Sequence, residues 1–242
     1  VQTIRRDLHE LGKRPRVRKR VPTRCRKDFK ARKKFQAFVR ANNILGKNIM
    51  SSDEVIISCM ENTGRLQWCA PGEHPFPRER KRRQNYPCFL LWTAFALGKK
   101  FDLVFFPLKE VDEDTGKPTL KGWRMNAKAY RKRCLGRVSG YLAQHPDIWF
   151  LQDGASCHTA NENKVYFEKR TIHLLQLPPY SPMLNPIEYA WKDLHAGIGR
   201  RCPTTQLELR QAAIEAWEEI PQAKLDAYLL AWNNAVNTVA TK

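Results

Sequence analysis

The sequence has no apolar run long enough to cross a membrane. Its longest, residues 88–97, has 10 residues, whereas a transmembrane helix needs about 20. No secretory signal precedes this run. Both absences argue against a membrane protein, and we expect a soluble chain without membrane contact.

The sequence also lacks any Cys-x-x-Cys spacing. Without paired spacings, neither a zinc site nor a disulfide framework is indicated, and free thiols in a reducing compartment fit better. The seven cysteines are scattered over the chain, and the simplest interpretation is that they are small buried apolar residues. They are Cys25, Cys59, Cys69, Cys88, Cys134, Cys157 and Cys202.

Acidic residues are few compared with basic ones. The chain has 24 Asp and Glu against 43 Lys and Arg, which gives a net charge of +19 and a pI near 9.9. Residues 1–50 hold 17 of the basic residues but only 3 of the acids. This imbalance is unusual for a metabolic enzyme and predicts a polyanionic partner such as nucleic acid.

The hydrophobic pattern predicts a basic N-terminal part followed by one mixed α/β domain. We expect residues 1–47 to hold a basic helix, a solvated linker and a second helix, and residues 48–242 to form the domain. Expected helices cover residues 3–11, 28–42, 125–144, 160–169, 186–198, 205–219 and 222–238, the linker covers 13–20, and strands cover 49–58, 66–69, 88–97, 101–106, 148–152 and 172–175. The first strands read as an antiparallel meander. The chain begins with Val within a helical pattern, so we expect an upstream portion.

Three acids stand on separate predicted elements. Asp53 lies on the first strand, Asp153 follows a short buried strand, and Glu188 lies in the first turn of a helix opened by Pro186. Carboxylates are the ligands that Mg²⁺ or Mn²⁺ prefers, and two such ions promote attack on a phosphodiester. Each acid also has a structural interpretation, because Asp often caps a helix and Glu favours a first helical turn. Together they predict a metal-dependent enzyme that cuts and joins DNA.

Two neighbouring acids do not fit this set. Glu54 is next to Asp53 on a strand, where consecutive side chains point to opposite faces. Asp193 is five residues after Glu188, about 140° further round a helix. The segment before Glu188 is rich in proline, which fixes several φ angles and favours a stiff approach to the acid.

Three motifs surround the three acids. They are Ser-Asp-Glu at 52–54, Gln-Asp-Gly-Ala-Ser-Cys-His-Thr at 152–159, and Ser-Pro-Met-Leu-Asn-Pro-Ile-Glu at 181–188, and 34 residues separate Asp153 from Glu188. With these motifs and this spacing, the chain resembles the mariner superfamily of DDE/D transposases, in the branch whose last acid is Glu.

The resemblance implies a ribonuclease H-like core, a mixed sheet flanked by helices and preceded by a basic helical and linker segment. It implies an enzyme that cuts transposon ends and joins 3′-hydroxyls to target DNA at TA, with Asp53, Asp153 and Glu188 holding two Mg²⁺ or Mn²⁺ ions. His158 either contacts the scissile phosphate, braces Asp153 or is a hydrogen-bonding residue at a helix start, and Asn185 is a further supporting residue.

The resemblance also implies partners. Residues 3–11 are similar to the last helix of a second helix-turn-helix, and the assembly is a homodimer on transposon and target DNA. We expect a location in the nucleus, or in the nucleoid of a prokaryotic host. The expected DNA-binding residues are Arg5, Arg6, Lys13, Arg14, Arg16, Arg18, Lys19 and Arg20.

One residue departs from the family pattern. Gly154 stands where the family commonly has Asn, which removes a polar side chain beside the acids. This leaves a second hypothesis open: a transposase-derived DNA-binding or regulatory protein without catalysis. A third is a generic basic nucleic-acid-binding domain, which leaves the proline-rich approach to Glu188 unexplained.

Overall fold

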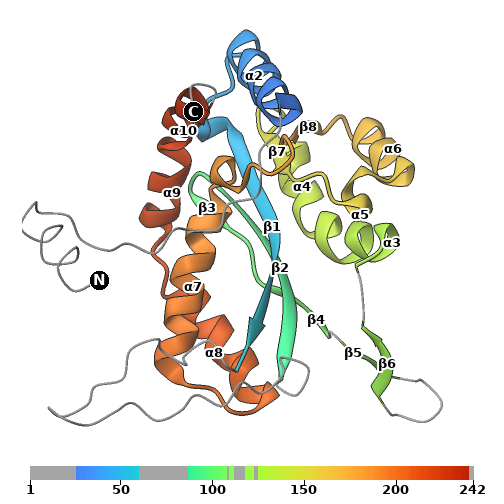
Figure 1. The fold of residues 1–242 in the computed structure, drawn as a ribbon, viewed down its shortest axis with the longest axis vertical. Helices are drawn as coiled ribbons and strands as arrows, with labels where there is room; N and C mark the ends of the chain where they lie inside the picture. The colour runs from blue at the N-terminus through green and yellow to red at the C-terminus, as the bar shows by residue number, and fades with distance from the viewer. Residues whose placement is uncertain (1–25, 60–86, 108, 112–117, 123–124, 240–242) are drawn as a thin grey trace, which may run out of the picture.

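The computed structural model describes residues 26–59, 87–107, 109–111, 118–122 and 125–239 (Figure 1). The predicted helix at residues 3–11, the linker at 13–20 and the predicted strand at 66–69 lie outside these ranges.

The strands are β1 (Ile49–Ser58), β2 (Cys88–Ala96), β3 (Lys99–Lys100), β4 (Val104–Pro107), β5 (Lys109–Val111), β6 (Pro118–Gly122), β7 (Trp149–Gln152) and β8 (His173–Gln176). The α-helices are α2 (Arg26–Ala41), α3 (Ala127–Ala129), α4 (Gly136–Gln144), α5 (Ser156–Thr159), α6 (Asn161–Lys169), α7 (Ile187–Arg201), α8 (Gln206–Glu218), α9 (Gln222–Leu230) and α10 (Trp232–Val239).

The main sheet is mixed. Its order is β3-β2-β1-β7-β8, with β4 also paired to β2. The pairs β1–β2, β2–β3 and β2–β4 are antiparallel, whereas β1–β7 and β7–β8 are parallel. The predicted meander is therefore confirmed for these early strands, and its turn uses Gly98 at a φ of 69°, a value that glycine adopts without strain.

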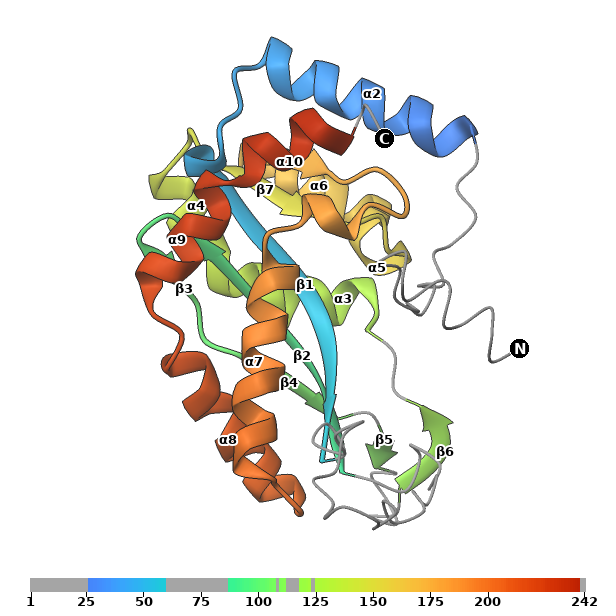
Figure 2. The ribbon, with the colours of Figure 1, turned by 60° about the vertical axis from the view of Figure 1, so that its left-hand side comes forward.

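Helices cover both faces of this sheet (Figures 1 and 2). Helices α7, α8 and α9 lie on one side, and α3, α4 and α6 lie on the other. One buried cluster packs residues such as Ile49 and Leu151 against Ile187 and Leu194 of α7. The other packs Met50 and its neighbours against the α4 side. Alternate β1 side chains thus enter opposite cores, as the period of two in a strand requires.

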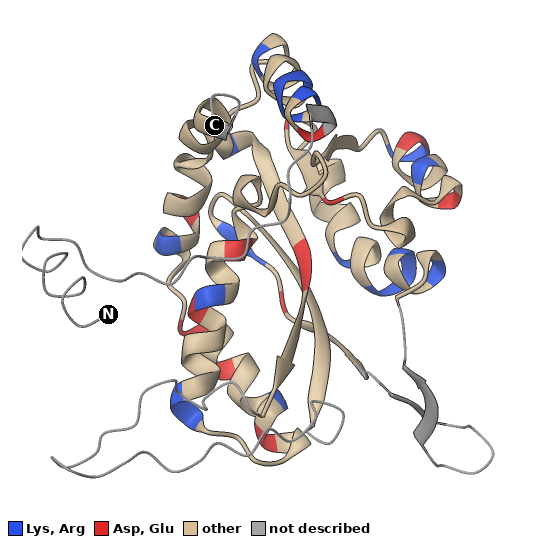
Figure 3. Ribbon diagram, in the orientation of Figure 1, with Lys and Arg blue, Asp and Glu red and all other residues tan. Residues whose placement is uncertain are grey.

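Helix α2 packs on the sheet domain, although its residues fall within the range expected for the basic N-terminal part. Phe35 joins the core cluster and meets Trp232 edge to face, at 6.2 Å between ring centroids. Phe38 makes a similar contact with Trp149 at 5.6 Å. Lys and Arg occupy other positions of the helix (Figure 3). Packing of one apolar stripe against the domain therefore fixes the position of α2.

The structure departs from the expected elements at several points. Within the predicted helix at residues 125–144, Tyr130–Leu135 form a π-helical segment, η3, between α3 and α4. The short helix α5 precedes α6, and the predicted helix at 222–238 is divided near Ala231 into α9 and α10. The strand expected at 101–106 begins only at Val104. The spacing of apolar residues did not predict these departures, because it hardly differs between the expected and the observed elements.

Membrane contact and the burial of the cysteines were two further expectations from the sequence. Among the described helices, none combines the length and the apolar character needed to span a bilayer. Of the cysteines in the described ranges, Cys134 is buried as expected, whereas Cys59, Cys88 and Cys157 are only partly buried and Cys202 is exposed.

The contact between α7 and α8 provides a stability test. A Cβ added at Gly197 of α7 would lie 2.6 Å from the Cβ of Ala216, whereas one added at Gly140 of α4 would meet nothing within 4 Å. Replacing a helical Gly by Ala gains up to about 1 kcal/mol, but overpacking a core costs about 1–3 kcal/mol. We expect Gly197→Ala to lower the free energy of unfolding and Gly140→Ala to raise it. Urea denaturation checks both, and equal shifts would contradict the packing argument.

Candidate active site

Parallel pairing of β1 with β7 brings Asp53 and Asp153 to the same level of the sheet. The pairs run from Ile49 with Trp149 to Ser51 with Leu151. Continued by two residues, this register sets Asp153, just beyond the end of β7, beside Asp53. Ser52 Oγ donates to the carbonyl of Leu151 at 3.0 Å and supports the same alignment. The predicted position of Asp153 at the carboxyl end of a buried strand is therefore confirmed.

A buried network joins the start of α7 to β1 next to Asp53. Ser51 Oγ donates to Asn185 Oδ1 at 2.6 Å and accepts from the backbone N–H of Ile187 at 3.0 Å. Asn185 Nδ2 donates to the carbonyl of Ser52 and to Asp53 Oδ2, at 3.2 and 3.3 Å. Asn185 is almost fully buried, so these bonds have no competition from water. They hold the first turn of α7, with Glu188, against the strand that carries Asp53.

The proline-rich approach to Glu188 is tied to α2. Buried Arg32 donates through Nε to Ser181 Oγ at 2.9 Å and through Nη2 to the carbonyl of Tyr180 at 2.7 Å. Tyr180 has a φ of 52°, in the left-handed region. The segment then passes through the short 3₁₀ helix η4 (Pro182–Leu184) into α7. The expected stiffness thus comes from Arg32 as well as from the prolines.

The three acids influence one another electrostatically. Burial raises the pKa of Asp53 well above its ordinary value, and the charges of Glu54, Asp153 and Glu188 raise it further. Burial also raises the pKa of Glu188, and Asp153 adds to that rise while Lys192 opposes it. All three side chains are only partly buried, so each keeps access to solvent. Figure 3 shows acidic positions on β1 and near the start of α7.

The three acids do not form a closed metal cage. Within the described ranges, no group of three or more His, Cys, Asp or Glu side chains is arranged to hold an ion. Asp153 instead bonds to His158, and Asp53 bonds to Asn185. The donor set still fits a hard divalent cation, because it consists of carboxylate oxygens whose mutual repulsion such a cation would relieve.

His158 lies between two carboxylates. Its Nδ1 is 2.7 Å from Asp153 Oδ1, its Nε2 is 2.9 Å from Glu54 Oε1, and its side chain is 2% exposed. Tyr130 covers the imidazole, with ring centroids 4.3 Å apart. Burial lowers the pKa of His158, but hydrogen bonds to Asp153, Cys157 and Glu54 outweigh it and raise the pKa to about 12. Of the roles considered for His158, the one observed in the structure is a hydrogen bond that holds Asp153.

Sequence reasoning separated the acids correctly but missed one partner. Glu54 does point away from Asp53, as expected, yet on its own face it reaches His158. No sequence signal marks this contact, which joins residues 104 positions apart. Asp193 faces elsewhere, as expected, and accepts from Lys224 and Tyr228. The expected DNA-binding residues between Arg5 and Arg20 lie outside the described residues.

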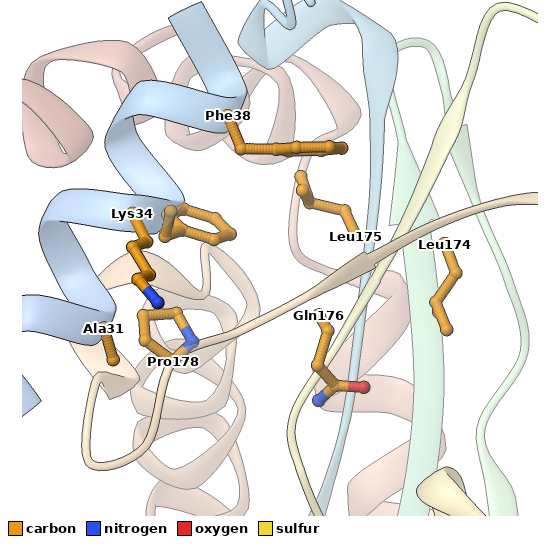
Figure 4. Close-up of a pocket in the computed structure, with 8 residues that line it drawn as sticks. Ala31, Lys34, Phe38, Leu174, Leu175, Gln176 and Pro178 are labelled. Carbon is orange, nitrogen blue, oxygen red and sulfur yellow. The ribbon is translucent and has the colours of Figure 1, made fainter.

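A separate cavity of about 490 Å³ lies between α2 and β8 (Figure 4). Its walls are mainly apolar and include Phe35, Phe38, Leu175 and Pro178, with Lys34 and Gln176 as polar members. None of the three acids lines it, so it is not part of the candidate site.

Sequence comparison relates the chain to transposases. The family described as "DDE superfamily endonuclease" matches residues 120–210, which include Asp153 and Glu188. The Tc3 transposase of Caenorhabditis elegans is 30% identical over 193 residues, or 76% of this chain and 54% of that protein. The Tcb2 transposase of Caenorhabditis briggsae is 25% identical over 256 residues, covering 99% of this chain and 84% of that one. The chain thus spans about half the length of the Tc3 relative.

Structural comparison confirms the fold. The Mos1 transposase paired-end complex with left transposon end matches with a TM-score of 0.79 and 17% identity, over 99% of this chain and 69% of that one. The catalytic domain of Mos1 mariner transposase matches with a TM-score of 0.59 and 14% identity, over 93% and 97%. The ribonuclease H-like mixed sheet flanked by helices is therefore confirmed.

The environment of His158 predicts how stability depends on pH. The folded protein keeps this imidazole charged up to a pKa of about 12, whereas an unperturbed His has a pKa of 6.5. Its contribution is fully present below pH 6.5 and declines as the pH rises toward 12. We expect the stability difference between the wild type and His158→Asn to shrink between pH 6.5 and about 9. Chemical denaturation at several pH values measures it, and a constant difference would contradict the bonding described.

Proposed function

We propose that the chain is a DDE transposase of the mariner superfamily, and that it cuts transposon ends and joins their 3′-hydroxyls to target DNA at TA. The match to the DDE superfamily endonuclease family and the similarity to the Tc3 transposase support this proposal. The observation that carries this proposal is the alignment of Asp53 with Asp153 across β1 and β7, with Glu188 held beside them by the Asn185 network. These acids come from three separate elements, as predicted for a phosphodiester-cutting site.

We propose that Asp53, Asp153 and Glu188 hold two divalent cations, Mg²⁺ or Mn²⁺. When bound, such ions activate the attacking oxygen and stabilise the leaving oxygen of a phosphodiester. The crowded carboxylates support this assignment, since their raised pKa values reflect repulsion and burial that a cation would offset. Paired-end complexes of Mos1 have been solved with Mn and with Mg.

The protein's own part in the reaction is to position these acids. Asn185 holds Asp53 through its Oδ2, and His158 holds Asp153 through its Oδ1. The Ser51 bond to the Ile187 N–H fixes the helical turn that carries Glu188. The acids are thereby oriented before DNA arrives, which lowers the entropic cost of reaching the transition state.

We further propose that the partners are transposon-end and target DNA and a second copy of the chain. The Mos1 transposase forms a paired-end complex with a left transposon end, which supports both partners. The +19 charge favours DNA binding. The basic N-terminal part would bind the phosphate backbone through Arg5, Arg6 and the residues from Lys13 to Arg20. We propose a nuclear location, or the nucleoid in a prokaryotic host.

A catalytically silent DNA-binding protein is the second candidate. Gly154 favours it, because the resembled family commonly has a polar Asn beside its second Asp. A Cβ at this position would meet only Gln176 Nε2, at 3.7 Å, so packing does not require glycine here. The same cutting assay separates the two functions.

Removal of a single carboxylate should abolish cutting. A bound ion stabilises the transition state by several kcal/mol, and about 1.4 kcal/mol is a tenfold change in rate. We expect Asp153→Asn and Glu188→Gln to reduce nicking of end-containing DNA with Mn²⁺ by at least about 100-fold. The matched control is Asp193→Asn on the same helix, which should keep nicking. DNA binding without nicking in the wild type as well would favour the second candidate.

The basic linker should set the salt dependence of DNA binding. Each phosphate contact releases counterions and adds about 0.9 to the slope of log K against log salt concentration. We expect replacement of the six basic residues in 13–20 by Gln to weaken binding to all DNA sequences and to flatten that slope. Titrations at increasing NaCl measure both effects, and an unchanged slope would remove this linker from the interface.

A further inference from the structure

Glu54 makes a contact that the three-acid site does not require. Its carboxylate is 16% exposed and lies on the sheet face opposite Asp53, where α3, η3 and α5 pack. There Glu54 Oε1 lies 2.9 Å from Nε2 of His158. Both nitrogens of the imidazole face carboxylate oxygens, which only accept hydrogen bonds, so both nitrogens donate. The result is a continuous chain from Glu54 through His158 to Asp153.

The hydrogen bonds that run from Glu54 through His158 to Asp153 fix one carboxylate oxygen of Asp153 and leave its other oxygen without such a bond among the described residues. Oδ1 accepts from His158 Nδ1 at 2.7 Å and from the backbone N–H of Ala155 at 3.0 Å. Among the hydrogen bonds of the described residues, none reaches Asp153 Oδ2. The side chain of Asp153 is 48% exposed, whereas that of His158 is 2% exposed. The carboxylate therefore has one fixed oxygen facing the core and one oxygen accessible from outside.

The imidazole itself is held on its remaining sides. The Tyr130 ring lies against it, and the Tyr130 hydroxyl donates to Gln152 Oε1 at 2.8 Å, next to Asp153 in the chain. With the ring plane fixed by Tyr130, the contact with Glu54 decides the direction in which Nδ1 points. A partner of this kind behind a ligand-bearing residue commonly tunes metal affinity.

We propose that Glu54 is a positioning residue: through His158 it orients the carboxylate of Asp153 so that Oδ2 is presented to a divalent cation. This inference rests on the proposed function, since it assumes that Asp153 is a metal ligand. Glu54 does not touch the ion or the DNA. A purely structural ion pair would stabilise the fold and leave metal affinity unchanged.

The test is the affinity for Mn²⁺, measured by calorimetry on the 242-residue chain without DNA. Glu54→Ala removes the acceptor, and Glu54→Asp keeps the charge but is too short to reach His158. We expect each to weaken Mn²⁺ binding by about 10- to 100-fold. Glu54→Gln keeps an acceptor at the original length and should retain most of the affinity. If Glu54→Ala fails to fold, Glu54→Asp gives the same comparison.

Two controls make the outcome specific. Glu162 forms an exposed ion pair with Arg131 at 3.0 Å, so Glu162→Ala should leave Mn²⁺ affinity unchanged. Asp153→Asn should lose Mn²⁺ binding. Folded Glu54→Ala or Glu54→Asp protein with wild-type Mn²⁺ affinity, beside an Asp153→Asn variant that has lost it, would overturn the role of Glu54 alone. If Asp153→Asn also bound Mn²⁺ normally, the metal site of the proposed function would fail as well.

Discussion

The pairing of β1 with β7 is the constraint on which the site depends. This parallel register aligns residues that are 100 positions apart, so that Asp53 of β1 lies beside Asp153, just after the end of β7. The two strands lie in the middle of the sheet, between the helical layers. Because a shift by one residue would exchange the two faces of a strand, the buried neighbours Ile49 and Met50 hold the acids in place.

Glu188 reaches the same region by a different route. Its helix is not connected to β1 by backbone pairing, so the polar side chains of Ser51 and Asn185 perform that function inside the core. A buried amide of this kind is costly unless all its groups are bonded, and here each polar atom of Asn185 has a partner. The network is thus both a packing device and a means of orienting a carboxylate.

Much of the fold was predictable because its signals are local. β1 was predicted with its observed bounds, and α7 begins one residue after the start predicted for the helix at 186–198. The motifs singled out the three acids, and their role as metal ligands stays a prediction. The bond between Glu54 and His158 could not be predicted, because it joins elements that only the folded sheet brings together. The π-helical segment at Tyr130 was missed for another reason: its extra residue per turn leaves no mark on apolar spacing.

Helix α2 and the segment before α7 share a single buried cation. The guanidinium of Arg32 cannot withdraw from Tyr180 and Ser181 without leaving their oxygens and its own charge unsatisfied in the interior. These hydrogen bonds therefore hold α2 and the proline-rich segment in a fixed relative position. Any force applied at the N-terminal end of α2 would displace the proline-rich segment together with the helix, whereas each would move separately if water filled the space between them.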